Sequence, residues 1–171
     1  MDVGCDIHLH VEVKLGDSWF HASMSGEFSH RVYGMFAALA NVRNHFRIST
    51  IPCRGIPSDA SSGTLSHYLF RVTDKASAPL GVSREVAEDY VRRGICVYWL
   101  DNKNFITGPN WHSGSWCSVD ELEEAYINVF QDGNALTKPQ GDYADWKALL
   151  AYVKVLKESY YDVRLVYWFD N

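Results

Sequence analysis

The segment CDIHLHVEV, residues 5–13, constrains the fold most strongly, because apolar and polar side chains alternate along it without a break. Successive side chains of a β-strand point to opposite faces. A strand here would place Cys5 and the aliphatic residues on one face. The opposite face would carry two histidines between two acids: Asp6, His8, His10 and Glu12.

Further strands and helices are expected along the chain. Residues 18–23 follow a Gly16-Asp17 turn and are expected to pair with the opening strand as a hairpin. Apolar residues at helical spacing, together with capping residues, predict helices at 31–43, 64–70, 83–93, 118–130 and 143–160. Buried strands are predicted at 95–100 and 162–171, and irregular loops at 47–63 and 101–116.

These elements predict an α+β fold. Both the opening and the closing strands are strongly patterned, so we expect a mainly antiparallel sheet with the N- and C-terminal strands at its centre and helices packed on one face. The length of 171 residues fits a single domain over residues 1–171. Tyr160-Tyr161 and Tyr167-Trp168 could form a homodimer interface or could equally belong to the core.

Composition narrows the possible partners. The formal net charge of −5 and the absence of a basic run disfavour nucleic acid polymers, but local arginines could still hold a small phosphorylated ligand. The four cysteines form no C-x-x-C pair, so reduced, buried thiols are expected. The sequence shows neither a secretory leader nor a membrane span, which predicts a cytoplasmic protein.

The opening strand suggests a metal centre. His8 and His10 would lie about 7 Å apart at Cβ, on the same face. Two imidazoles at this spacing could bind one divalent ion of the zinc or manganese class, with Asp6 or Glu12 orienting the rings. The alternative is a polar face whose histidines are only exposed or hydrogen-bonded.

Two loops offer partners for these histidines. The first, CRGIPSDASS, carries Arg54 and Asp59, and the second, NWHSGSW, carries a histidine, two serines and a tryptophan: His112, Ser113, Ser115 and Trp116. We therefore expect a metal site formed by His8, His10, Asp59 and His112. Alternatively, Asp59 caps a turn and pairs with Arg54, and the tryptophans cover the core. The remaining histidines, His21, His30, His45 and His67, are expected to be structural.

The sequence as a whole resembles a family of small uncharacterised proteins encoded by tailed phages and prophages. The resemblance rests on CDIHLH, RVYGMFAALANVRN, RGIPSDAS, WHSGSW and the closing WFDN. It implies action in the cytosol of an infected bacterium. It singles out Asp6, His8, His10, Arg43, Arg54, Gly55, Pro57, Asp59, Ser61, His112, Ser113, Ser115 and Trp116. An acidic residue expected near Asn110 is missing, which argues against a two-metal site.

Two functions are compatible with these residues. The first is a metal-dependent hydrolase, a phosphoesterase acting on a nucleotide or another small phosphorylated substrate. In it Asp59 and His112 would bind the ion with His8 and His10, while Arg54 and Arg43 would neutralise phosphate charge. The second is a non-enzymatic phage accessory or counter-defence protein that binds a host protein or sequesters a signalling nucleotide.

Overall fold

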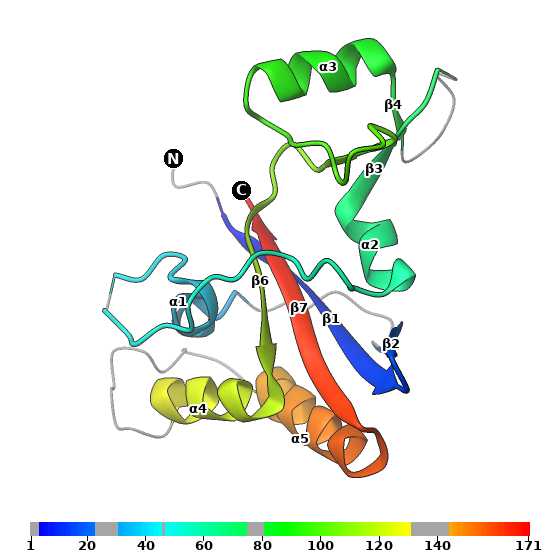
Figure 1. Cartoon of the computed structure of the whole chain (residues 1–171). Coiled ribbons are helices and arrows are strands. Elements are labelled where there is room, and N and C mark those ends of the chain that lie inside the picture. The colour runs from blue at the N-terminus through cyan, green and yellow to red at the C-terminus, as the bar shows by residue number, and fades with distance from the viewer. Residues whose placement is uncertain (1–3, 23–30, 46, 75–80, 131–143) are drawn as a thin grey trace. The chain divides into compact units, whose positions relative to one another are not determined.

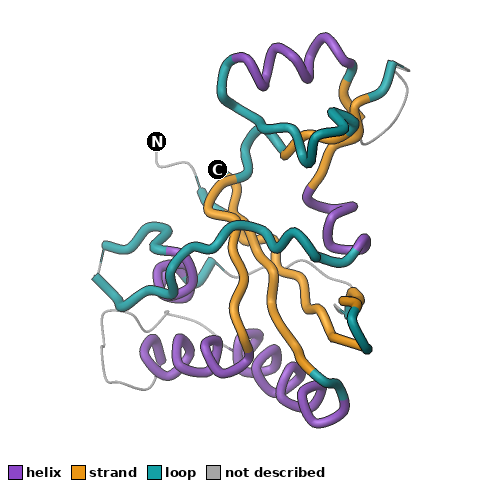
Figure 2. The backbone as a smooth tube through the Cα atoms, in the orientation of Figure 1, coloured by secondary structure: helices purple, strands orange, loops and turns teal. Residues whose placement is uncertain are grey.

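The computed structural model describes residues 4–22, 31–45, 47–74, 81–130 and 144–171. The chain divides into two compact units, one built from residues 1–61 and 112–171 and the other from residues 62–111. Figure 1 labels their helices and strands, and Figure 2 colours the same backbone by secondary structure. A single domain over residues 1–171 stays a prediction.

The first unit combines an antiparallel sheet with helices. Its described elements are β1 (Asp6–Leu15), β2 (Ser18–His21), α1 (Tyr33–Ala40), β6 (His112–Ser118), α4 (Val119–Phe130), α5 (Ala144–Ser159) and β7 (Asp162–Asp170). The strands lie in the order β2-β1-β7-β6, and each neighbouring pair is antiparallel. The strands from the two ends of the chain, β1 and β7, are therefore central, which confirms the predicted α+β sheet (Figure 1).

The main hydrophobic core lies between this sheet and helices α1, α4 and α5. Ile7, Val11 and Val13 of β1 enter it and Leu9 packs against it, as the alternation predicts, whereas Leu15 at the end of the strand is exposed. Helix α5 contributes the fully buried Trp146, and β7 contributes Tyr167 and Phe169. The Tyr167-Trp168 pair is buried, which assigns it to the protein interior, whereas Tyr161 is exposed.

Local signals set the ends of two helices as predicted. Asn41 follows α1 in the left-handed conformation, with φ 58°, and its N–H donates to the Ala37 carbonyl over 2.8 Å. At α4, Ser118 and Glu121 form the predicted capping box. The Ser118 N–H donates to the Glu121 carboxylate over 2.9 Å, and the Glu121 N–H donates to Ser118 Oγ over 3.2 Å.

The second unit is smaller and has its own sheet and core. Its described elements are α2 (Ser62–Tyr68), β3 (Leu69–Val72), β4 (Gly81–Val82), α3 (Arg84–Arg92) and β5 (Phe105–Thr107). The strand order is β4-β3-β5, in which β3 pairs with β4 in parallel and with β5 antiparallel. Buried Val72, Ala87, Cys96 and Ile106 form its core.

Several predicted boundaries are wrong. Residues 95–100 form bends with an isolated bridge from Tyr98 to Ile106, instead of the predicted strand. Conversely, the predicted loop at 101–116 contains β5 and most of β6. Glycine- and serine-rich HSGSWCS becomes a strand because β7 supplies its hydrogen-bonding partner, and tertiary context of this kind overrides local propensity.

The four cysteines are free thiols. Cys5, Cys96 and Cys117 are buried as expected, and burial raises the pKa of each of these thiols. The expectation is wrong for Cys53, which is exposed and whose Sγ donates to the Gly114 carbonyl over 3.1 Å. Among the described helices, none is long and apolar enough to cross a membrane.

A buried ion pair fixes the polar face of β1 to β7 and to the loop before α2. Glu12 is 0% exposed and Arg164 is 5% exposed. One Glu12 oxygen accepts from Arg164 Nε over 2.8 Å, and the other accepts from the Ser61 N–H over 2.7 Å. Arg164 also donates to Asp59 over 2.9 Å. The Arg164 guanidinium also lies 3.8 Å from the centroid of the Trp19 ring. We call these four residues, Glu12, Asp59, Arg164 and Trp19, the arginine brace.

We predict that Glu12→Gln lowers the free energy of unfolding by roughly 3 kcal/mol, because it leaves the buried Arg164 guanidinium without its main counter-charge. Urea denaturation followed by circular dichroism measures the change. The control is Glu158→Gln, which removes one carboxylate from an exposed position on α5 and is expected to shift stability by less than about 0.5 kcal/mol. Equal unfolding midpoints for the two variants would contradict a stabilising role for the brace.

Candidate functional site

The polar face of the sheet in the first unit carries a histidine cluster. We define it as His8 and His10 of β1, His21 of β2, and Trp168 and Asp170 of β7. His8 lies opposite Trp168 on β7, and its Nε2 is 3.2 Å from an Asp170 carboxylate oxygen. His10 Nδ1 lies 2.9 Å from Nε2 of His21, on β2. One imidazole of this pair must donate and the other accept. Three strands thus contribute to one cluster.

The aromatic rings of the cluster form a stack. The His8 ring lies nearly parallel to the Trp168 indole, at an angle of 9° and a centroid distance of 5.5 Å. The His10 ring lies at 13° and 4.8 Å from the same indole. Trp168 is completely buried, whereas His8 and His10 are partly exposed and His21 is exposed. The cluster therefore presents partly exposed imidazoles beside a buried indole.

The predicted phosphate-binding arginine is already engaged by a carboxylate. Arg54 Nη1 donates to Glu121 over 2.9 Å, a second bond joins Nη2 to the other oxygen, and the guanidinium lies 4.7 Å from the Trp116 ring centroid. The hydrogen bond from Arg54 holds the pKa of Glu121 below its usual value. The Arg54 N–H also donates to buried Ser115 Oγ over 3.0 Å. This pair fastens the loop to α4 and β6.

His112 lies on the opposite face of the sheet from His8 and His10. It pairs with Phe169, which pairs with Ile7, and its ring stacks on Phe169 at 24° and 6.0 Å. Its Nδ1 is 3.1 Å from Ser113 Oγ, and Ser113 has a φ of 51° at the β-bulge. Within the described residues its buried Nε2 has no hydrogen-bond partner.

The structure does not gather the four expected metal ligands. His8 and His10 share a cluster, Asp59 belongs to the arginine brace, and His112 lies on the core face. No group of three or more His, Cys, Asp or Glu side chains that could hold a metal ion occurs among the described residues. The donor set therefore does not fit a metal centre in this conformation.

The other predicted site residues have separate surroundings. Asp6 forms a two-bond ion pair with Arg31, over 2.6 and 2.7 Å, which lowers the pKa of Asp6. The Arg43 guanidinium lies 5.3 Å from the Tyr33 ring centroid. Asp59 accepts from Trp19 Nε1 over 3.1 Å, in addition to its bond from Arg164.

Sequence reasoning missed five members of the two clusters: Trp19, His21, Arg164, Trp168 and Asp170. His21 was expected to be structural, and Trp168, Asp170 and Arg164 were not assigned to the polar face. The signal that could have found them is strand register, since pairing of the first and last strands places even-numbered residues of both on one face. His45 is an exposed loop residue and His67 lies on α2, while His30 lies outside the described residues.

Comparison of the chain with protein-family models, curated proteins and solved structures finds no significant match.

The Arg54–Glu121 pair predicts a pH dependence of stability. A carboxylate with a lowered folded pKa stabilises the fold above its unfolded pKa, and this contribution is lost as the pH falls through the folded pKa. We expect Glu121→Gln to cost about 1 kcal/mol at pH 7. The difference from the unsubstituted protein should shrink as the pH drops below the ordinary Glu value of 4.5. Urea midpoints measured across this range provide the test, and a difference independent of pH would contradict it.

Proposed function

We propose that the protein binds a small phosphorylated ligand of the nucleotide class at the histidine cluster, without turning it over. The observation that supports this proposal is the stack formed by the His8, His10 and Trp168 rings. A partly exposed imidazole over a buried indole offers a flat surface on which a nucleobase can stack. Stacking of this kind contributes about 1–3 kcal/mol per base and tolerates different bases.

The polar edges of the same cluster suit the rest of such a ligand. Imidazole N–H groups donate hydrogen bonds to phosphate or ribose oxygens, and the Asp170 carboxylate accepts from a base or a ribose hydroxyl. The net charge of −5 opposes a long polyanion, so we propose a mononucleotide or dinucleotide instead of a polymer. In keeping with the resemblance to phage proteins, we place this binding in the cytosol of an infected bacterium.

Hydrolysis of the same class of ligand is the second candidate function. It is favoured by the His8–Asp170 pair, because a carboxylate that orients an imidazole is a common feature of general bases. The metal-dependent form of this hypothesis has less support, because the expected ligands do not fit a metal ion as they are placed. Arg54 also has a carboxylate partner, so it would have to leave Glu121 to contact a phosphate.

We predict saturable binding of at least one member of a panel of mononucleotides and cyclic dinucleotides, measured by isothermal titration calorimetry. The double variant His8→Ala/His10→Ala should weaken binding at least tenfold, about 1.4 kcal/mol, since it removes both exposed rings of the stack. His45→Ala is the matched control, because it removes an exposed imidazole outside the cluster. Absence of binding by every nucleotide tested, or equal affinities in the two variants, would contradict the proposal.

Turnover separates the two candidate functions. We expect no release of phosphate or nucleoside from a bound nucleotide and no stoichiometric metal in the purified, untagged protein by elemental analysis. Release of product that disappears in Asp170→Asn would instead support catalysis by the His8–Asp170 pair. Near-stoichiometric zinc or manganese that is lost in His8→Ala/His10→Ala would revive the metal-dependent hydrolase. Capture of a host protein in place of a nucleotide would support the other form of the accessory-protein hypothesis.

A further inference from the structure

A β-bulge in β6 brings a serine and a histidine into contact, at a place that has no role in the function proposed above. β6 pairs with β7 at His112 and again at Ser115, and the register shifts between these two residues. Within the bulge, Oγ of Ser113 lies 3.1 Å from Nδ1 of His112. We infer that Ser113 is a nucleophilic serine, with His112 as its general base, which accepts an acyl group from a small activated ester.

The backbone conformation at Ser113 makes this contact possible. Neighbouring side chains of a regular strand point to opposite faces, so a serine directly after a histidine would point away from it. Ser113 instead has a φ of 51°, in the left-handed region, and its hydroxyl reaches the imidazole of the preceding residue. Glycine adopts this region without strain, whereas a residue with a Cβ does not. The fold therefore holds Ser113 in a strained conformation that places its hydroxyl beside a base, and strain of this kind is typical of active sites.

The two nitrogens of the His112 ring have different surroundings. Nε2 is buried and has no hydrogen-bond partner in the part of the chain that the structure describes, and the ring stacks on Phe169. Nδ1 is the nitrogen that contacts the hydroxyl. In the tautomer with its proton on Nε2, Nδ1 accepts from Ser113 and can take up the hydroxyl proton. A hydroxyl within hydrogen-bond reach of such a base is the arrangement that activates a serine.

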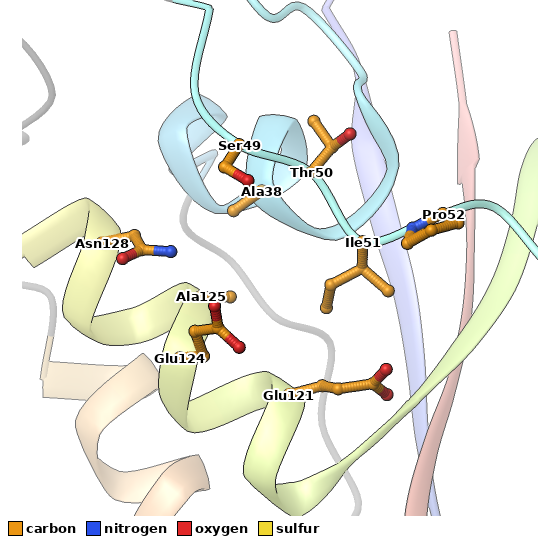
Figure 3. Close-up of a pocket in the computed structure, with 9 residues that line it drawn as sticks. All are labelled: Ala38, Ser49, Thr50, Ile51, Pro52, Glu121, Glu124, Ala125 and Asn128. Atoms are coloured by element: carbon orange, nitrogen blue, oxygen red, sulfur yellow. The ribbon is translucent and has the colours of Figure 1, made fainter.

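The loop before α2 holds the bulge in place. Sγ of Cys53 donates to the Gly114 carbonyl over 3.1 Å, and the Arg54 N–H donates to Ser115 Oγ over 3.0 Å. This loop continues from residues 49–52, which face α4 across the pocket in Figure 3. Ser113 itself is only partly buried, which leaves it open to a small reagent. The pair is thus positioned before a substrate arrives.

The acyl transfer needs only these two residues and the ester. Oγ of Ser113 bonds to the ester carbonyl carbon while the hydroxyl proton moves to Nδ1 of His112. The bond from that carbon to the alcohol oxygen then breaks, and the leaving alcohol takes the proton from Nδ1. Among the described residues no carboxylate orients the imidazole through Nε2, as a third group does in a catalytic triad. We therefore assign esters with a good leaving group as the substrate class.

A fluorophosphonate tests the nucleophile, because it phosphonylates reactive serines with loss of fluoride and the hydroxyl proton. Mass spectrometry of the digested full chain should locate the adduct on Ser113. Ser66 is an internal control, since it is exposed and its hydroxyl donates to the Gly63 carbonyl instead of an imidazole. No adduct, or equal modification of Ser113 and Ser66, would overturn the inference.

Three variants assign the roles. Ser113→Gly should abolish the adduct and keep the fold, because glycine suits a φ of 51°. His112→Phe keeps an aromatic ring beside Phe169 but removes the base, so it should slow phosphonylation at least tenfold. Ser66→Ala should react at the rate of the unsubstituted protein. An unchanged rate in His112→Phe would overturn the assignment of His112 as the base.

p-Nitrophenyl acetate tests acyl transfer itself. The unsubstituted protein should release p-nitrophenol and carry an acetyl group on Ser113, and Ser113→Gly should release p-nitrophenol at least tenfold more slowly. Equal release by the two proteins would show that another group attacks the ester, and it would overturn the role of Ser113.

Discussion

The antiparallel pairing of β1 with β7 is the constraint on which the first unit depends. It runs from Asp6 opposite Asp170 to Lys14 opposite Asp162 and joins the two ends of the chain. The buried Glu12–Arg164 pair lies within it and links residues 152 positions apart. Contacts over such separations form only after a large loss of chain entropy, so the hydrogen bonds and the buried apolar area of this pairing must offset that cost together.

The same pairing produces two chemically different faces. Ile7, Val11 and Val13 of β1 join the hydrophobic core with α1, α4 and α5, Leu9 packs against it, and the even-numbered residues carry the ionisable groups. The polar face is divided along its length. Near Glu12, the loop that carries Asp59 and Ser61 covers it through the arginine brace. Near His8 and His10, aromatic stacking on Trp168 accompanies the contact between His8 and Asp170, and both histidines are partly exposed.

Alternation and helical spacing predict the fold because each depends on local geometry. They identify the hairpin, the α4 capping box, the long α5 helix and the central place of the terminal strands. They fail at β6, whose serines and glycine form a strand only because β7 lies beside them. The prediction of a metal site likewise depended on which strands pair, which local patterns do not show. Period two correctly places His8 and His10 together, but only strand register decides which face His112 occupies.

Ion pairing decides which chemistry each region can offer to a ligand. Arg31, Arg54 and Arg164 are each paired with a carboxylate, so an anion would have to compete with Asp6, Glu121 or Glu12 for them. In the function that we propose, the histidine cluster recognises a nucleotide without those arginines, because ring stacking needs no free charge.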